Sequence, residues 1–284
     1  MIVTKLKQVV EQGKNVENVL YLRSLLKETI QDYILNFVYN SQIYKKLIFT
    51  GGTCLRKIYS LPRLSEDLDF DFIENFNIST FSQKIKDYFS KNLQYKTLET
   101  KISGNKNTIF LKFPILKEVG LVKNPSDSTL LFVRCDFSQE VIGIFGQEIN
   151  PISSDEYTIF ALSYDLPTLF SNKIIAILKR RFYKGKTQKI SFKGRDIFDL
   201  VWFLEKSKKN NWQLQPNWNR VFKQLKVIDK ETVVKMLVDK TETLDKKDVY
   251  TDLLPFIESY SILKNFSENF DKIIKSNIEK LISI

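Results

Sequence analysis

The spacing of hydrophobic residues changes twice along the chain. Between residues 5 and 40 they recur every three or four positions, which predicts one packing helix or a pair. Between residues 94 and 152 the period falls to two, so residues 108–113 and 130–137 are expected to be strands. From Asp165 the helical spacing returns and continues to the end of the chain. The order of these periods predicts a sheet followed by a group of helices.

Local signals refine this division. Residues 79–93 carry apolar side chains on one side, and we expect a helix there that begins at a Ser or Thr cap. Pro167 stands where the first turn of a helix tolerates proline, so another helix is expected to start just after Asp165. The pattern predicts an α+β protein with two lobes. The N-terminal lobe, residues 1–164, is expected to hold a mixed sheet, and residues 165–284 a helical lobe.

Residues 47–72, LIFTGGTCLRKIYSLPRLSEDLDFDF, carry the densest chemical signal. The apolar start, residues 47–50, is typical of a short buried strand, which ends abruptly at Gly51 and Gly52. Two glycines before a helical stretch permit a tight turn and leave N–H groups at a helix N-terminus, where phosphate can bind. An ordinary glycine turn without a ligand is the alternative.

Three aspartates follow at alternate positions. Asp67, Asp69 and Asp71 are separated by large apolar residues, so the two-residue period of a strand places them on one face. Aspartate is disfavoured in strands and neighbouring carboxylates repel, so we expect a cation to neutralise the row. Mg²⁺ suits carboxylates that act together with substrate phosphates. The alternative is an amphipathic edge strand with a solvated acidic face.

Further charged residues stand in the later elements. Asp136 is a lone carboxylate in an apolar strand, where it joins the Asp67 row if the strands are neighbours; alternatively it pairs with Arg134 or ends the strand. Lys173 and Arg180 project from the same side of a predicted helix, which suits phosphate oxygens or an RNA backbone. A solvated basic face is the alternative for both.

The next predicted helix starts near two more aspartates. Asp196 sits at its start and Asp199 one turn later, so helix capping accounts for both without catalysis. The preceding segment, residues 181–193, is basic with aromatic interruptions and one glycine. Such a composition predicts a loop able to contact RNA through charge and stacking.

Composition narrows the chemistry. The 44 Lys and Arg residues against 33 Asp and Glu give a net charge of +11, which favours a polyanionic partner, although a general basic bias would give the same excess. The chain has no histidine, which excludes Ser-His-Asp and Cys-His catalysis and histidine-bound zinc. Cys54 and Cys135 are expected to be buried packing residues. No apolar run is long enough to cross a membrane, and we expect a cytoplasmic protein.

These motifs resemble a known family. The Gly-Gly turn and the SEDLDF segment are similar to the signature of the nucleotidyltransferase superfamily, and GGTCLRKIY with RLSEDLDF resembles the AbiEii/AbiGii type of bacterial toxin nucleotidyltransferase, which includes the MenT toxins. The segments SNKIIAILKRR and RDIFDL are similar to further parts of that family. The resemblance covers residues 45–75 and 165–205. It implies a nucleotidyltransferase core in the N-terminal lobe and an active site between the lobes.

The resemblance also implies an activity. A nucleoside monophosphate would pass from an NTP to an acceptor, with Mg²⁺ or Mn²⁺ as cofactor and pyrophosphate as product. MenT members resemble enzymes acting on the 3′ end of transfer RNA, which blocks aminoacylation and so translation. AbiEii members act in abortive infection, a form of phage defence, beside a cognate antitoxin. The implied partners are therefore an NTP, RNA and an antitoxin protein, with no membrane.

Roles for single residues follow from the same resemblance. The residues implied as catalytic are Asp67, Asp69, Lys173 and Asp196. Those binding nucleotide are Gly51, Gly52, Thr53, Ser65 and Lys173, and those holding metal are Asp67, Asp69 and Asp136. The basic composition described above, rather than the resemblance, adds the expected RNA contacts Arg180, Arg181, Lys184 and Lys186. Glu66 is expected to point to the other face. Two rivals remain: transfer to a protein or a small molecule such as an antibiotic, and a non-enzymatic RNA-binding or antitoxin-type module.

Overall fold

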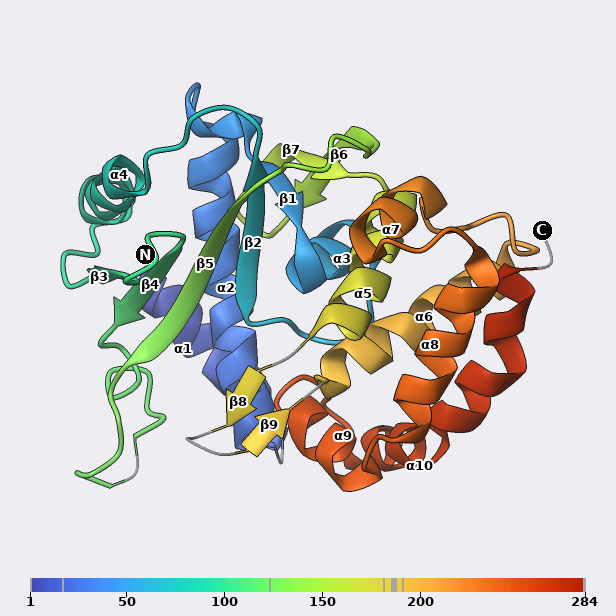
Figure 1. Cartoon of the computed structure of the whole chain (residues 1–284). Helices are drawn as coiled ribbons and strands as arrows, with labels where there is room; N and C mark the ends of the chain where they lie inside the picture. The colour runs from blue at the N-terminus through green and yellow to red at the C-terminus, as the bar shows by residue number, and fades with distance from the viewer. Residues whose placement is uncertain are drawn as a thin grey trace. The chain divides into compact units, whose positions relative to one another are not determined.

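The computed structural model describes residues 2–16, 18–122, 124–180, 182–184, 188–190 and 192–282 (Figure 1). The chain divides into two compact units. We call Met1–Val141 with Gln147–Ser163 the first unit, and Ile142–Gly146 with Tyr164–Ile284 the second unit. The predicted α+β class is confirmed, because the first unit contains a mixed sheet and the described elements of the second are mainly helices.

The sheet of the first unit has seven strands. They are β1 (Ile48–Thr50), β2 (Asp67–Phe72), β3 (Glu99–Ile102), β4 (Thr108–Phe113), β5 (Leu131–Gln139), β6 (Gln147–Ser153) and β7 (Thr158–Tyr164). Their order across the sheet is β3-β4-β5-β2-β1-β7-β6. The pairs β2–β5 and β1–β7 are parallel, whereas β1–β2, β3–β4 and β4–β5 are antiparallel. Both strands predicted between residues 94 and 152 are present.

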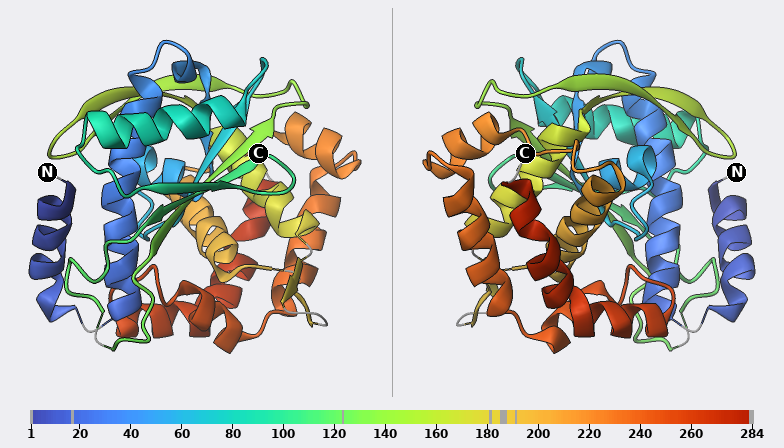
Figure 2. Two further views of the ribbon diagram at one scale, coloured as in Figure 1. Left: turned by 90° about the vertical axis from the view of Figure 1, so that its left-hand side faces the viewer. Right: turned by 90° about the vertical axis from the view of Figure 1, so that its right-hand side faces the viewer.

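The helices of the first unit begin at side-chain caps in two cases. The helices are α1 (Ile2–Gln12), α2 (Val19–Tyr39), α3 (Gly51–Tyr59) and α4 (Ile78–Lys91), with 3-10 turns at Gly13–Asn15 and Tyr44–Lys46. Asn18 caps α2 and Asn77 caps α4. The prediction of a Ser or Thr cap at Ser79 was wrong, because the Asn77 side chain accepts from the Thr80 N–H and starts the helix earlier. Figure 2 shows α1 alongside α2.

Aromatic side chains form the core on one face of this sheet. Phe49, Phe70 and Phe137 come from the neighbouring strands β1, β2 and β5 and stack on one another at centroid distances of 5.6 and 5.7 Å. Phe81 of α4 packs edge-on against Phe137, with 4.9 Å between ring centroids. Because side chains alternate along a strand, the residues on either side of Phe70 project from the opposite face of the sheet.

The second unit is built from helices with one short strand pair. The helices are α5 (Leu166–Lys179), α6 (Gly194–Lys209), α7 (Trp218–Leu225), α8 (Lys230–Glu242), α9 (Lys246–Leu253) and α10 (Tyr260–Asn277), followed by a 3-10 turn at Ile278–Leu281. Asp165 caps α5, with Pro167 in its first turn as predicted. Phe170 of α5 and Phe203 of α6 stack in parallel at 4.3 Å. No helix in the described ranges is long and apolar enough to cross a membrane.

A strand pair lies in the segment that was predicted to be a loop. Strands β8 (Phe182–Lys184) and β9 (Gln188–Ile190) pair in antiparallel fashion. The loop prediction for residues 181–193 was therefore wrong in part. Aromatic and β-branched residues such as Phe182, Tyr183 and Ile190 favour extended backbone, and the basic composition of the segment hid that preference.

Candidate active site

The Gly51-Gly52 turn joins β1 to α3 and packs directly against the aspartate row. Gly51 has a φ of +78°, and a Cβ atom there would stand 2.0 Å from Oδ2 of Asp69. Only glycine fits that backbone conformation and that approach. Thr50 caps α3 without a side-chain hydrogen bond, so its hydroxyl does not satisfy the N–H groups of the first turn. A helix begins at these two glycines, as the sequence predicted, and the Asp69 carboxylate lies against Gly51.

The buried polar side chains of Arg63 and Ser65 pack against this turn at Gly52. A Cβ atom at Gly52 would lie 2.9 Å from both Nη2 of Arg63 and Oγ of Ser65. Arg63 is only 3% exposed and donates to the Leu64 carbonyl at 2.8 Å. Thr53, fully buried, donates its hydroxyl to the Asp67 carbonyl and so ties α3 to β2. Sequence reasoning missed Arg63, because no spacing or composition signal marks a lone arginine in a loop.

Helix α2 fixes the loop that leads into the aspartate row. Gln31 donates from Nε2 to the Ser65 carbonyl at 3.0 Å, and Lys27 pairs with Glu66 at 3.1 Å. Ser65 is itself buried. The segment between α3 and β2 is therefore held at its backbone and at one side chain, and the start of β2 is fixed in register.

The aspartates lie on two neighbouring parallel strands. Asp67, Asp69 and Asp71 are partly exposed, whereas the intervening Leu68 and Phe70 are buried on the other face. Strand β5 runs beside β2, with Asp136 directly opposite Asp69 in the register. The condition set by the sequence, that the two strands be neighbours, is met. Asp69 and Asp136 are thus adjacent on one face of the sheet.

Arg134 provides a positive charge on the same face. It stands opposite Asp67 in the register and pairs with Asp136, with Nε at 3.0 Å from Oδ1 and Nη2 at 2.7 Å from Oδ2. Thr108 of β4 also donates to Oδ1 of Asp136 at 2.6 Å. Burial alone would lower the pKa of Arg134, but the hydrogen bond to Asp136 and the charges of Asp136, Asp67 and Asp69 outweigh it and raise the pKa.

Both hypotheses about Asp136 therefore describe the same side chain: it neighbours the aspartate row and it pairs with Arg134. The three carboxylates Asp67, Asp69 and Asp136 supply oxygen ligands of the kind that hard divalent cations prefer. In the side-chain arrangement of the structure, however, no group of three Asp, Glu or Cys residues among the described positions is placed to hold a metal ion. The strand register suits a cation, whereas the side chain of Asp136 is engaged by Arg134.

A second charged cluster lies in the second unit, between α5 and α6. Nζ of Lys173 lies 2.7 Å from Oδ2 of Asp199 and 3.3 Å from Oδ1 of Asp196. Nε of Arg180 lies 2.7 Å from the other oxygen of Asp196. The Asp199 side chain is fully buried, and that of Asp196 is 5% exposed. Lys173 is therefore held between two buried carboxylates, and Arg180 closes the cluster.

Helix capping, the alternative explanation for Asp196 and Asp199, does not account for their contacts with Lys173. The N-cap of α6 is Lys193, without a side-chain cap bond, and Asp196 stands in the first turn. Burial raises the pKa of Asp196, but the nearby charges of Lys173, Arg180 and Lys193 outweigh burial and hold the pKa below 3.8. Asp199, which sequence reasoning ranked below Asp196, makes the shorter contact with the lysine.

The residues predicted to contact RNA are placed only in part. Arg180 is engaged with Asp196, so it does not lie on a fully solvated basic face. Lys179 is exposed and donates to Oε1 of Gln224. Arg181 and Lys186, and the side chain of Lys184, lie outside the described residues.

The predicted cysteine burial is confirmed, since Cys54 and Cys135 are both buried and free.

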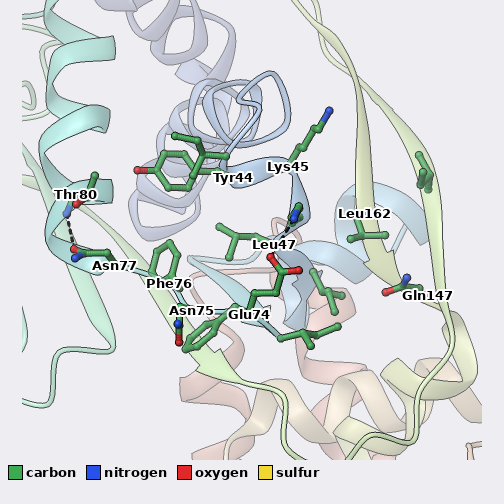
Figure 3. A pocket seen from close by; sticks show the side chains of 16 residues that line it. Tyr44, Lys45, Leu47, Glu74, Asn75, Phe76, Asn77, Thr80, Gln147 and Leu162 are labelled. Carbon is green, nitrogen blue, oxygen red and sulfur yellow. Dashed lines mark hydrogen bonds and ion pairs between the residues drawn. The ribbon is translucent and has the colours of Figure 1, made fainter.

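A pocket of about 660 Å³ lies elsewhere in the first unit (Figure 3). Its lining includes the apolar residues Leu47, Phe72, Phe76 and Leu162. Phe72 projects from the face of β2 opposite to the aspartates, since it follows Phe70 by two residues. The lining also includes polar residues, among them Lys45, Lys46 and Glu74, but none of the aspartates of the row or Asp136. We therefore assign this pocket no part in the chemistry of the aspartate row.

The fold is similar to those of solved protein structures. MenT4, a nucleotidyltransferase toxin from Mycobacterium tuberculosis, is similar with a TM-score of 0.52 and 13% identity, over 95% of this chain and 89% of that chain. JHP933 from Helicobacter pylori is similar with a TM-score of 0.48 and 14% identity, over 91% of this chain and 93% of that one. No curated protein matches the sequence. At such identities the likeness to MenT4 shows a shared fold, that of a nucleotidyltransferase toxin.

The family follows from the sequence itself. The profile of the AbiEii family, nucleotidyl transferase toxins of type IV toxin-antitoxin systems, matches residues 36–279. This match includes the Gly-Gly turn, both parallel aspartate strands and the lysine cluster of the second unit. The chain belongs to the AbiEii nucleotidyltransferase toxin family.

Proposed function

We propose that this protein transfers a nucleoside monophosphate from an NTP to the 3′ end of transfer RNA and thereby blocks translation. The observation that carries the proposal is the pair of in-register carboxylates, Asp69 and Asp136, on parallel strands beside the Gly51 turn. Family membership supports the transferase class. The net charge of +11 supports RNA as acceptor over a protein or a small molecule.

The donor set suits a divalent cation. Asp67, Asp69 and Asp136 would hold Mg²⁺ or Mn²⁺ after Asp136 leaves Arg134, since hard cations bind through carboxylates together with substrate phosphates. When bound, such an ion polarises the α-phosphate and stabilises charge on the departing pyrophosphate. The remaining functions fall to side chains and backbone groups of the chain.

The protein groups would bind and orient the triphosphate. N–H groups of Gly51, Gly52 and Thr53 at the start of α3 suit the β- and γ-phosphates, with the buried Ser65 hydroxyl beside Gly52. Lys173, oriented by Asp196 and Asp199, would balance the charge of the triphosphate. In this assignment the two aspartates of the lysine cluster are positioning residues, because they act through Lys173.

The reaction forms one bond and breaks one. The 3′-hydroxyl oxygen of the acceptor attacks the α-phosphorus, and the bond from that phosphorus to the bridging oxygen of pyrophosphate breaks. The hydroxyl proton passes to a carboxylate of the aspartate row, because the chain contains no histidine to accept it. Pyrophosphate leaves, and the RNA gains one nucleotide.

Family membership supports a biological setting for this activity. The toxin-antitoxin assignment supports a cognate antitoxin that counteracts this activity in the cell. We propose a role in abortive infection, in which modified transfer RNA halts translation in an infected cell. Expression of the chain without an antitoxin should stop growth, and the Asp69→Asn variant should not.

Incubation with each α-labelled NTP and total cellular RNA tests the proposal. We expect label on RNA of transfer-RNA size, its loss with a chelator, and its loss after periodate oxidation of RNA 3′ ends. Asp69→Asn should abolish labelling, whereas Glu74→Gln, which removes an exposed carboxylate paired with Lys46 beyond the end of β2, should not. Label on protein or on a small molecule would favour the rival acceptors, and RNA binding without any labelling would favour the non-enzymatic module.

A further inference from the structure

The guanidinium of Arg134 occupies both carboxylate oxygens of Asp136. The two contacts, 3.0 Å from Nε and 2.7 Å from Nη2, form the paired geometry in which arginine binds a carboxylate most specifically. The Thr108 hydroxyl adds a third bond to Oδ1. Because Arg134 contacts both oxygens of Asp136, this carboxylate cannot bind another cation through both oxygens while the arginine is in place.

The strand register explains why the arginine stands there. Arg134 and Asp136 are two residues apart on β5 and so share a face, opposite Asp67 and Asp69 respectively. Adjacent carboxylates repel, and one positive charge among them relieves that repulsion. The arginine thus serves the row as an internal counter-cation.

Exposure permits the arginine to leave. Its side chain is 43% exposed, while that of Asp136 is 22% exposed, so the pair lies at the border of the protein and solvent. Ion pairs at this depth are weak compared with buried ones, because water screens them. Arg134 can therefore turn toward solvent or toward a phosphate without leaving a fully buried partner.

We propose that Arg134 competes with the divalent cation for Asp136, and that it moves onto a phosphate of the bound nucleotide when the cation takes its place. This inference rests on the proposed function, because it assumes that the aspartate row holds a cation during nucleotidyl transfer. Its consequence is that the row binds a cation weakly without nucleotide and strongly with it. Such coupling is reciprocal, so the cation strengthens nucleotide binding by the same factor.

Binding of Mn²⁺ alone, measured by the loss of the free-ion electron paramagnetic resonance signal, tests the competition without any catalysis. Arg134→Gln removes the competing charge, and we expect its Mn²⁺ dissociation constant to fall by up to about five-fold, the range set by one exposed ion pair. Lys112→Gln is the matched control. It removes one positive charge from β4, the strand next to β5, at a position opposite Phe132, and should leave Mn²⁺ affinity near that of the parent.

A double variant locates the effect. In Arg134→Gln with Asp136→Asn the gain in Mn²⁺ affinity should vanish, because the competition is for that carboxylate. Arg134→Lys keeps the charge but not the two-point contact, so its affinity should fall between those of the parent and Arg134→Gln. This lysine variant also carries the test if the glutamine variant melts at a much lower temperature than the parent.

The outcomes separate the two levels of the proposal. If the parent binds Mn²⁺ and Asp69→Asn does not, while Arg134→Gln and Arg134→Lys bind no more tightly than the parent, the competition is overturned and the proposed function stands. If neither the parent nor the variants bind Mn²⁺, with or without a non-hydrolysable NTP analogue, both are overturned. If Lys112→Gln bound Mn²⁺ as tightly as Arg134→Gln, the competition would also be overturned, since the loss of any nearby positive charge would then explain the gain in affinity.

Discussion

At the scale of single residues, compensation of charge determines how the carboxylates of this protein are arranged. Asp136 at the sheet surface pairs with Arg134, and the buried Asp196 and Asp199 share Lys173. The two settings differ in consequence. An exposed pair can be exchanged for another partner at little cost, whereas removing one member of a buried cluster leaves a charge in a poorly solvated place.

Replacing Lys173 tests how strongly the buried cluster depends on its lysine. Lys173→Met should lower the free energy of unfolding by about 3 kcal/mol, because Asp199 loses a cation at 2.7 Å while remaining fully buried. Adding Asp199→Asn should restore a large part of that loss, since the buried carboxylate that has lost its lysine is then replaced by a neutral amide. Urea unfolding of the parent and both variants measures this. Equal instability of the single and double variants would contradict the role assigned to Asp199.

Transfer activity distinguishes function from stability in the same variants. Lys173→Met, alone or with Asp199→Asn, should label RNA more slowly than the parent by orders of magnitude, because the ammonium proposed to balance the triphosphate is missing in each variant. A double variant that regained stability and activity together would show that Lys173 serves only the fold.

The lowered pKa of Asp196 predicts a dependence of stability on pH. A carboxyl group whose pKa is lower in the folded protein than in the unfolded chain stabilises the fold fully above its unfolded pKa. For Asp196 that contribution is present above 3.8 and is lost as the pH falls through the lower folded value. The difference in unfolding free energy between the parent and Asp196→Asn should therefore be constant near neutrality and shrink below pH 3.8. A difference that grows on acidification would contradict this sign.

At the scale of elements, the second unit holds a segment that is distant in sequence from its helices. Ile142–Gly146 belongs to that unit, although it lies between β5 and β6 of the first. Arg220 of α7 is 3% exposed and donates to Asn172 at 2.7 Å and to the Ile144 carbonyl at 3.0 Å. Lys223 donates to the Ile142 carbonyl at 2.7 Å. Two basic residues of one helix thus bind the carbonyls of the segment.

Arg220→Met should loosen this segment and destabilise the second unit. Two charge-assisted hydrogen bonds are lost and the Ile144 carbonyl loses a donor, so we expect a cost of about 2 to 4 kcal/mol in unfolding free energy. Amide hydrogen exchange at Gly146, whose N–H donates to Thr168, should become faster. Lys223→Met is the matched variant and should cost less, since that lysine is exposed. Unchanged exchange at Gly146 in Arg220→Met would contradict this role.

Periodicity predicted the elements well because each signal is local. Thr108–Phe113 is a strand as expected, and the alternation of Asp67–Phe72 correctly placed the aspartates on one face. Asn77 displaced the predicted cap by two positions, since asparagine, serine and threonine compete as caps on nearly equal terms. The β8–β9 pair was missed because its basic composition suggested a loop.

The periodicity of the sequence could not predict contacts between residues that are distant along the chain. That Asp136 lies opposite Asp69 depends on strand order, which the sequence allowed but did not determine. That Arg134 takes both oxygens of Asp136, or that Arg63 lies buried under Gly52, depends on rotamers set by packing. Asp199 was given no role in the site because capping accounted for it and the resemblance pointed to Asp196, whereas its contact with Lys173 depends on packing.

At the scale of the whole molecule, the excess of 11 positive charges is the feature that bears on the acceptor. A basic protein gains affinity for nucleic acid by releasing condensed counterions, and this gain depends on salt rather than on sequence. The pairing of Arg180 with Asp196 removes that arginine from the set of charges free to neutralise phosphate. The basic residues left from the predicted RNA contact are Arg181, Lys184 and Lys186, to which the exposed Lys179 beside them is added.

Salt dependence of RNA binding, the last prediction, separates the RNA acceptor from its rivals. Affinity for a single-stranded 3′ end should fall with a log-log slope of about −0.7 per phosphate neutralised. Changing Lys179, Lys184 or Lys186 to Gln should each make the slope shallower by about that amount, as one counterion fewer is released. Lys91→Gln, an exposed lysine of α4 paired with Asp87, serves as the control for net charge and should leave the slope unchanged. A steep slope in the parent that none of the three variants alters would move the RNA contact to another surface, and a flat slope in the parent would favour a protein or small-molecule acceptor.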